Sequence, residues 1–387
     1  MKPIEKIISL FDGISCAYEA AKKAGCTIKE YYASEIDKYA IEISKKNHPD
    51  IIHVGDVSKL TIDPYAFNFT GGLDLLVGGS PCQDLSIAKA NRKGLDGDRS
   101  GLFFEYVRIL NETKPRYFIL ENVASMPKAD MEKISEILGV QPIMINAALV
   151  SAQNRKRLFW VGKYQKVGKV PKIGEDGYVD VYGYRQVDIK LPDDQGIVLN
   201  DILIDGDTDD VKSLCITATY ASKNRQDYEK KRMGQMIRIG DIGSNAQAHR
   251  VYSPNGKSVA LSALGGGQGA KTGLYLVQKP HGFNKGGEHH EKSPTLTKSS
   301  FEQNNHVTDG YMLRKLHPIE CERLQGLPDN YTEGVSNTQR YKMCGNAFNV
   351  DVVAHIISQL VCIVGETPLT PSLNLCEQHA IQSLNKK

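Results

Sequence analysis

Cys82 is the residue of this 387-residue chain whose surroundings best suit covalent chemistry. An apolar run typical of a strand, Leu73–Val77, is followed by Gly78-Gly79-Ser80-Pro81-Cys82-Gln83. A cysteine on a turn at the carboxyl end of a strand is positioned as a nucleophile, whereas a core cysteine normally lies within an apolar run. An inert turn cysteine is the alternative when Pro81-Cys82 is taken alone.

Two further segments carry polar side chains that such a nucleophile would use. Glu121-Asn122-Val123 follows another strand-like run, Tyr117–Leu120, so we expect a carboxylate beside Cys82 in one crevice. Farther on, Gln153-Asn154-Arg155-Lys156-Arg157 precedes a third apolar run, and alternation in an extended segment puts its two arginines on one side. These arginines could hold a substrate carbonyl, a phosphate or Glu121. A solvated basic face is the competing interpretation.

A separate set of residues predicts a nucleoside cofactor. The first turn between a strand and a helix is Phe11-Asp12-Gly13-Ile14-Ser15, whose glycine lets the main chain approach a ligand at the carboxyl end of the strands. Glu35 lies 22 residues beyond Gly13, where a carboxylate can bind ribose hydroxyls, and Asp56 could accept from an adenine amino group. A tight turn alone would explain the glycine, but acidic residues after successive strands favour the cofactor. GxGxxG is absent, which disfavours a dinucleotide.

Alternating strand and helix patterns surround these residues. Apolar runs predict strands, and periodic apolar positions predict helices, which alternate as in an α/β domain with a parallel sheet and right-handed crossovers. The predicted strands are Ile7–Phe11, Tyr31–Ser34, Ile51–Val54, Leu73–Val77, Tyr117–Leu120 and Leu158–Val161, and the helices are Ser15–Ala24, Lys38–Asn47 and Leu102–Glu112. Short β-like pieces and loops follow from about Gly162 to Gly310, and helical patterns return at Pro318–Leu324 and Val350–Leu360. We therefore predict that the middle is an insertion into the α/β unit.

The composition is that of an ordinary soluble globular protein, with 41% hydrophobic and 24% charged residues. A formal net charge of +3 neither requires nor opposes a nucleic-acid partner. The 8 cysteines form no CxxC pair and have no histidine at ligand spacing, so we expect free thiols and no metal. No secretory signal and no apolar stretch of membrane-spanning length is visible, which predicts a cytoplasmic protein without a membrane partner.

Together these motifs resemble those of the DNA (cytosine-5) methyltransferases. Their order and spacing match that family over about residues 5–162 and 312–358. The matching residues are Phe11-Asp12-Gly13, Glu35, Asp56, Pro81-Cys82-Gln83, Glu121-Asn122-Val123, Gln153-x-Arg155-x-Arg157, Arg323-Leu324-Gln325-Gly326 with Pro328, and Gly345-Asn346-Ala347-Phe348. The family often has a further glycine where this chain has Ser15 or Cys16. Phe-Asp-Gly-Ile is similar to the variant in animal de novo methyltransferases.

The resemblance implies the Rossmann-like sheet of S-adenosylmethionine-dependent methyltransferases, with an inserted target-recognition domain made mostly of strands and loops. It places the catalytic and cofactor-binding domain in residues 1–162 and 311–387 and the target-recognition domain in residues 163–310. Polar clusters in the latter are rich in side chains that read base edges or bind phosphates, at residues 223–226, 247–250, 265–268 and 299–306. The basic, glycine-rich residues 83–101, directly after Cys82, fit a loop that closes over the DNA backbone.

The resemblance also implies the chemistry. A cytosine flipped out of duplex DNA is attacked at C6 by the Cys82 thiolate, while Glu121 acts as an acid at N3. Arg155 binds the cytosine carbonyl oxygen, with Arg157 beside it. The methyl donor is S-adenosyl-L-methionine, which leaves as S-adenosyl-L-homocysteine, and no metal takes part. The implied cofactor contacts are Phe11, Asp12, Gly13, Ile14, Glu35, Asp56, Val57, Pro81, Asn346, Ala347 and Phe348.

The expected partner is double-stranded DNA, with a cognate restriction endonuclease as a second partner in a restriction-modification system. We expect a monomer, and the lack of a regulatory extension favours a bacterial or phage source. A tRNA cytosine-5 methyltransferase shares the catalytic motifs, but the long middle region disfavours it. A catalytically silent DNA-binding relative is disfavoured by the presence of Cys82, Glu121 and Arg155. A nicotinamide oxidoreductase is a more distant third alternative.

Overall fold

The computed structural model describes residues 3–62, 72–80, 101–171, 178–206, 208, 210–223, 235–241, 276–278, 287–289, 305–306 and 311–362. The chain divides into two compact units. Unit 1 comprises Met1–Ile202, Asp210–Gln235 and His317–Lys387, and unit 2 comprises Leu203–Asp209 and Met236–Leu316. Unit 1 therefore takes in residues beyond the predicted boundary at residue 162. The assignment of residues 163–310 to target recognition stays a prediction.

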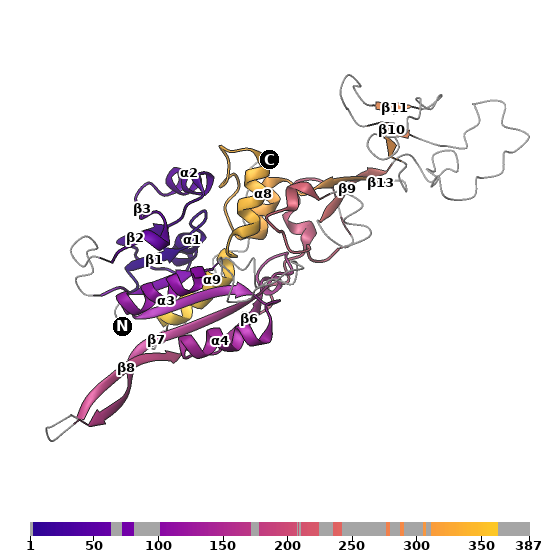
Figure 1. Cartoon of the computed structure of the whole chain (residues 1–387). Coiled ribbons are helices and arrows are strands. Elements are labelled where there is room, and N and C mark those ends of the chain that lie inside the picture. The colour runs from indigo at the N-terminus through magenta and orange to yellow at the C-terminus, as the bar shows by residue number, and fades with distance from the viewer. Residues whose placement is uncertain are drawn as a thin grey trace, which may run out of the picture. The chain divides into compact units, whose positions relative to one another are not determined.

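Among the described residues of unit 1, eight strands form one sheet, in the order β3-β2-β1-β4-β5-β7-β6, with β8 paired to β7 (Figure 1). Neighbours from β3 through β5 are parallel, and β7 is antiparallel to β5, β6 and β8. The strands are β1 Lys6–Leu10, β2 Glu30–Ser34, β3 Ile52–His53, β4 Leu75–Gly78, β5 Tyr117–Val123, β6 Pro142–Asn146, β7 Lys156–Pro171 and β8 Tyr178–Gln186.

The α/β class is confirmed, but the prediction of a parallel sheet needs one correction at β7. Residues 147–155 are the whole connection between β6 and β7. A short connection between neighbouring strands joins them antiparallel, because a parallel pair needs a crossover of a dozen or more residues. As a result β7 runs opposite to β5, and its first residues lie where β5 ends.

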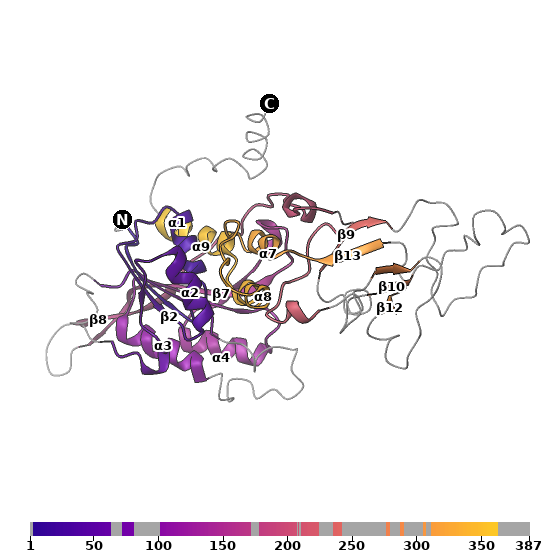
Figure 2. The same ribbon diagram turned by 90° about the horizontal axis from the view of Figure 1, so that it is seen from above.

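The strand side chains alternate between two faces, and each face has its own core. Ile7 of β1 packs in one core with α1 (Cys16–Lys23), α2 (Lys38–Asn47) and α9 (Val350–Cys362). The next residue, Ile8, packs in the other core with α3 (Gly101–Thr113) and α4 (Lys128–Leu138). Figure 2 shows α1 and α9 on one side of the sheet and α3 and α4 on the other. Unit 1 is thus a three-layer α/β/α arrangement.

The predicted helices are confirmed as α1, α2, α3, α7 (Pro318–Leu324) and α9. Sequence patterns missed α4, β6, β8 and α8 (Asn337–Asn346). The short 3-10 helices are η1 Val57–Lys59, η3 Ala147–Leu149, η4 Leu199–Ile202 and η5 Tyr220–Ser222. No helix in the described part of the chain has the length and apolar character needed to cross a membrane.

The regular structure described in unit 2 consists of short antiparallel strands. β9 (Met236–Asp241) pairs with β13 (Tyr311–Lys315), while β10 (Leu276–Gln278) pairs with β11 (Gly287–His289) and β12 (Asn305–His306). Of the four polar clusters predicted to contact DNA, residues 247–250 and 265–268 lie outside the described residues, and the other two are described only in part.

The C-terminal helices of unit 1 are fastened to its N-terminal half. α9 packs against α1, and Lys23 of α1 forms an ion pair with Asp351 of α9. Lys342 of α8 pairs with Asp37 at a distance of 2.6 Å, from Lys342 Nζ to Asp37 Oδ2. These contacts bring the residues that precede α9 next to the carboxyl edge of the sheet, where the predicted site residues are found.

Candidate active site

The predicted motifs gather at one edge of the sheet. Since β1, β2, β4 and β5 are parallel, the loop 11–15, Glu35, Gly79-Ser80 and Glu121 lie at the same carboxyl edge. Because β7 is antiparallel to β5, its amino-terminal end lies at this edge, and Val123 of β5 pairs with Arg157. Glu121-Asn122-Val123, predicted to follow a strand, forms the last three residues of β5. The antiparallel direction of β7 therefore brings Arg157 to the Glu121 carboxylate.

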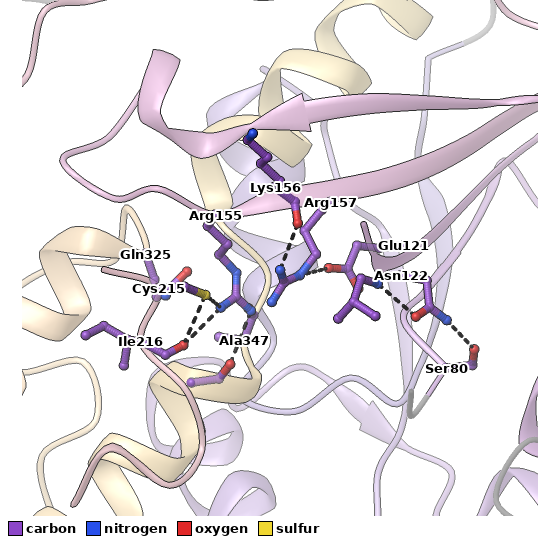
Figure 3. A network of polar contacts seen from close by, with 12 residues as sticks. Ser80, Glu121, Asn122, Arg155, Lys156, Arg157, Cys215, Ile216, Gln325 and Ala347 are labelled. Carbon is purple, nitrogen blue, oxygen red and sulfur yellow. Dashed lines mark hydrogen bonds and ion pairs between the residues drawn. The ribbon is translucent and has the colours of Figure 1, made fainter. Parts of the chain in front are cut away.

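Glu121 and Arg157 form an ion pair at this edge, with 2.8 Å between Arg157 Nε and Glu121 Oε1 (Figure 3). The two side chains are 13% and 17% exposed, so both remain reachable. A Cβ atom at Gly79 would lie 2.9 Å from Glu121 Oε2 and 2.8 Å from the Phe348 ring. The absence of a side chain at Gly79 therefore leaves the space that Glu121 and Phe348 occupy. Sequence reasoning did not single out this glycine.

A small pocket lies beside the ion pair. Its lining combines the charged side chains of Glu121, Arg155 and Arg157 with apolar and amide groups from β6, η3, β7, the two residues before α9 and α9 itself: Ile145, Ala147, Phe159, Phe348, Asn349 and Val352. Next to it, Asn122 Nδ2 donates to Ser80 Oγ at 3.3 Å, which ties β5 to the residues after β4. Pro81 and Cys82 lie outside the described residues.

Arg155 is placed differently from the prediction that it binds a substrate carbonyl. Its side chain is buried, with 4% exposed, and its guanidinium donates to four protein acceptors (Figure 3). Nη1 donates to Ile216 O at 3.2 Å and to Cys215 Sγ at 3.5 Å, and Nη2 donates to Gly345 O at 3.2 Å and Ala347 O at 2.8 Å. Burial lowers the pKa of this guanidinium. Because both Nη atoms are engaged, Arg155 joins chain segments, and its buried Nε has no hydrogen-bond partner among the described residues.

Gly345 is required for the same junction. A Cβ atom at this position would lie 2.3 Å from the main chain of Thr217 and Ala218, closer than any side chain tolerates. The adjacent residues 212–216 are in turn tied to the segment before Arg155: Ser213 N donates to Ala152 O at 2.7 Å, and Asn154 N donates to Ser213 O at 3.0 Å. The Gly345-Asn346-Ala347-Phe348 motif is therefore locked to Arg155 and to residues 212–218.

Within that motif the three predicted cofactor contacts differ in exposure. Asn346 is exposed, while Ala347 and Phe348 are mostly buried. The next residue, Asn349, accepts from Val352 N at 3.0 Å and so caps α9. Phe348 lies against Gly79, and Asn346, two residues earlier in the sequence, is exposed to solvent.

The loop between β1 and α1 contains the first set of predicted cofactor contacts. Phe11, Gly13 and Ser15 all have a positive φ, of 57°, 60° and 63°. Nothing lies within 4 Å of a Cβ atom at Gly13, so the main chain there is open to a ligand. The side chains of Asp12 and Ile14 point into the protein, 4% and 2% exposed, so a contact from either would have to come from its main chain.

Glu35 is placed as a ribose-binding carboxylate would be. Its Oε2 accepts from Gly13 N at 2.8 Å, and its Oε1 accepts from the main-chain N–H groups of Ile36 and Asp37. A carboxylate has about four acceptor positions, so one remains for a hydroxyl group. The next residue, Ile36, is 74% exposed, an unusual position for a large apolar side chain that no pattern had flagged. An open glycine, a half-buried carboxylate and an exposed isoleucine together fit a nucleoside.

Asp56 and Val57 follow β3 at the same edge. Asp56 caps η1 by accepting from Ser58 N at 3.0 Å and Ser58 Oγ at 2.8 Å, and these hydrogen bonds lower its pKa. Val57 is buried in the core that contains α3. The Asp56 carboxylate is therefore ionised and near solvent, while the Val57 side chain has a structural role.

This arrangement is typical of enzymes that bind a ligand at the carboxyl edge of an α/β sheet. A family model for C-5 cytosine-specific DNA methylases matches residues 5–362. The chain is 28% identical over 358 residues to the type II methyltransferase M.HhaI of Haemophilus parahaemolyticus, covering 91% of this chain and 92% of that protein. It is 26% identical over 440 residues to the orphan methyltransferase M.SPRI of Bacillus phage SPR, covering 92% and 97%.

Among solved structures, the methyltransferase EhMeth of Entamoeba histolytica is similar in fold, with a TM-score of 0.57, 15% identity and coverage of 95% of this chain and 100% of the other. The chain therefore belongs to the C-5 cytosine-specific DNA methylases, enzymes that methylate carbon 5 of cytosine in DNA with S-adenosylmethionine as the methyl donor. The predicted family and activity are confirmed.

The buried Asp12 carboxyl makes a pH dependence of stability testable. Burial raises the pKa of Asp12 from 3.8 to about 6, although hydrogen bonds from Ser15 and Tyr31 act to lower it. Since the folded-state pKa is above the unfolded value, stability from this group is present at low pH and is lost as pH rises through about 6. Relative to Asp12→Asn, we expect the protein to lose about 1.4 kcal/mol between about pH 5 and about pH 7.5.

Urea denaturation of both proteins at several pH values measures this difference. The Asp12→Asn curve corrects for all other titrating groups, because only position 12 differs. A constant difference in unfolding free energy across that pH range would contradict the raised pKa.

Proposed function

We propose that Cys82, Glu121 and Arg157 carry out the methylation chemistry on a cytosine flipped out of a specific duplex DNA sequence. The observation that carries this proposal is the Glu121–Arg157 ion pair at the carboxyl edge, beside Gly79-Ser80. Cys82 follows Ser80 by two residues in the sequence. Cytosine presents its N3 and its carbonyl oxygen side by side, and the paired carboxyl and guanidinium groups match that edge.

In this proposal the Cys82 thiolate adds to C6 of the cytosine and forms a carbon–sulfur bond. Electron density moves toward N3, where protonated Glu121 donates a hydrogen bond and limits the charge on the ring. Bound S-adenosylmethionine supplies an electrophilic methyl group for carbon 5. Loss of the C5 proton to a base then restores the double bond and expels Cys82 as thiolate. Base flipping is required because C6 is inaccessible within the stacked duplex.

Arg157, rather than Arg155, is proposed to hold the cytosine carbonyl oxygen. Arg155 is buried and donates to carbonyl groups of Ile216, Gly345 and Ala347. Arg157 is half-buried, and its Nε pairs with Glu121 at the carboxyl edge, where the carbonyl oxygen beside cytosine N3 would lie. A guanidinium there stabilises negative charge that develops on the ring during attack.

The proposed cofactor pocket consists of the loop 11–15, Glu35 with Ile36, Asp56 and the Asn346-Ala347-Phe348 segment. Glu35 would accept from the ribose, the exposed Ile36 side chain would cover the adenine ring, and Asp56 would accept from the adenine amino group. Pro81 is carried over from the resemblance alone. Asp12 and Ile14 contribute through their main chain, because their side chains are buried.

The target-recognition role of residues 163–310 is also part of the proposal, and the family match over residues 5–362, which includes this region, supports it. M.HhaI is named a type II methyltransferase, whereas M.SPRI is named an orphan. Because the chain is similar to a type II methyltransferase, a cognate restriction endonuclease is proposed as a partner. The enzyme itself is proposed to act as a monomer in the cytoplasm of a bacterium or of a phage-infected cell.

Glu35→Ala and Asp56→Ala should weaken S-adenosylmethionine binding with little effect on folding. Loss of a hydrogen bond to a charged group corresponds to roughly 10- to 100-fold in Kd for Glu35, and less for the more exposed Asp56. Isothermal titration calorimetry measures this change. Glu30→Ala, at the opposite end of the same strand, is the matched control and should bind normally. Unchanged affinity in both edge variants would remove the pocket assignment.

Replacing each arginine by alanine should have different effects: one variant should lose methylation rate and the other should lose stability. Arg157→Ala should lower the single-turnover methylation rate roughly 100- to 1000-fold, as for other lost transition-state donors, while the thermal midpoint hardly changes. Arg155→Ala should lower stability by about 3–5 kcal/mol, because buried carbonyls lose their donors. Equal loss of rate and stability in the two variants would contradict the assignment of different roles.

Duplex DNA with 5-fluorocytosine at the target should trap the covalent step. The thiol can leave C6 only after C5 loses a proton, and fluorine cannot depart that way. With S-adenosylmethionine present, we expect a denaturation-resistant adduct that maps by peptide mass to the segment containing Cys82. Cys82→Ser should form no adduct and show no turnover, because a serine hydroxyl is far less ionised than a thiol.

The same assay distinguishes the proposed substrate from tRNA. A fluorinated tRNA transcript should form no adduct, and Cys82→Ser should still bind cofactor. Bisulfite sequencing of plasmid from cells that express the enzyme then reports the target sequence. An adduct on another cysteine, or faster reaction with tRNA than with duplex DNA, would overturn this part of the proposal.

A further inference from the structure

Ser15 holds a main-chain conformation that disfavours residues with a side chain. Its φ of 63° is in the left-handed region, where Cβ crowds the following carbonyl. It is the third residue with positive φ in the loop, after Phe11 and Gly13, and the only one of the three whose side chain is fully buried. A glycine would adopt this conformation without steric cost, so some interaction of the serine must compensate for it.

The Ser15 hydroxyl group does not cap α1, although a serine at an N-cap position usually does. Ser15 precedes α1 as the N-cap residue, yet its side chain makes no capping hydrogen bond to the helix. Instead, Ser15 Oγ donates to Asp12 Oδ2 at 2.6 Å, and Ser15 N donates to Asp12 O at 3.1 Å. Two hydrogen bonds thus connect the same pair of residues across Gly13 and Ile14.

Asp12 is the end point of a buried series of hydrogen bonds. Tyr31 OH donates to its Oδ1 at 2.6 Å. Because the single hydroxyl proton of Ser15 goes to Asp12, Ser44 Oγ must be the donor in the 2.6 Å contact between Ser44 and Ser15. Ser44 Oγ in turn lies 3.3 Å from His53 Nε2. The series joins the loop to β2, α2 and β3 and supplies Asp12 with fixed donors.

We propose that Asp12 and Ser15 are positioning residues, whose side-chain hydrogen bond holds the loop 11–15 in the conformation that binds S-adenosylmethionine. Neither side chain is exposed enough to touch the cofactor, at 4% and 0%. Their influence passes through Gly13, whose N–H donates to Glu35 Oε2 at 2.8 Å. This inference rests on the proposed cofactor pocket. The inference explains why Asp12 is buried although burial disfavours its charge: the carboxylate fixes the conformation of the loop and does not add to stability.

Two substitutions at Ser15 separate this role from a direct contact. Ser15→Ala removes the hydroxyl but keeps the Cβ that disfavours positive φ, and we expect the Kd for S-adenosylmethionine to rise roughly 5- to 30-fold. Ser15→Gly removes the same hydroxyl together with the steric conflict, and we expect a Kd within about twofold of the unaltered protein. Calorimetric titration of the full-length enzyme with S-adenosylmethionine measures both.

Asp12→Ala tests the other partner. It should weaken binding as Ser15→Ala does, and Asp12→Ala combined with Ser15→Gly should recover affinity, because glycine needs no support. Ser135→Ala, which removes a hydroxyl bonded to Trp160 Nε1 and Met131 O in the opposite core, is the control for a buried serine. It should lower the thermal midpoint without changing Kd.

The outcomes separate this inference from the pocket itself. If Ser15→Ala and Ser15→Gly bind equally, whether both strongly or both weakly, the positioning role is wrong. If Glu35→Ala weakens binding in the same experiment, the pocket stands even so. If Glu35→Ala, Asp12→Ala and Ser15→Ala all bind normally, the pocket and the inference fail together.

Discussion

The buried guanidinium of Arg155 is the constraint on which the active edge depends. Burying a charged group to 4% exposure is costly unless acceptors surround it, and both Nη atoms of Arg155 have such acceptors. Those acceptors come from residues 215–216 and from 345 and 347, about 60 and 190 positions away in the chain. The three segments must therefore assemble together. Gly345, which lets the main chain approach Thr217, makes that assembly sterically possible.

The edge residues take their positions from this junction. Arg157 is two residues beyond Arg155, and its pairing with Val123 in the β5–β7 register brings it to Glu121. Two arginines in one motif thus differ in burial and in partners: Arg155 is buried and joins distant chain segments, whereas Arg157 is half-buried and pairs with Glu121. The difference comes from where the fold places each guanidinium, since both groups have the same chemistry.

The loop 11–15, proposed to bind the cofactor, shows the opposite relation between stability and function. Asp12 is buried against its electrostatic preference, and burial raises its pKa to about 6. Such a group lowers stability at neutral pH, so its presence calls for another contribution. In this loop that contribution is conformational, because three positive φ values must be held at once beside Glu35. Hydrogen bonds that involve Tyr31 of β2 and Ser44 of α2 support this strained loop.

The sequence alone determined the strand and helix alternation, the edge at which the motifs meet, and the family. Apolar periodicity reports burial directly, which is why α1, α2, α3 and α9 were predicted nearly to the residue. Tertiary structure decided the direction of β7, the burial of Arg155 beside the more exposed Arg157, and the burial of the Asp12 side chain. Each of these depends on which distant acceptor or donor a side chain meets, such as Ala347 for Arg155 or Tyr31 for Asp12. Residue type and spacing carry no record of that choice, because a polar group is satisfied equally well by any partner that the folded chain brings within hydrogen-bond distance.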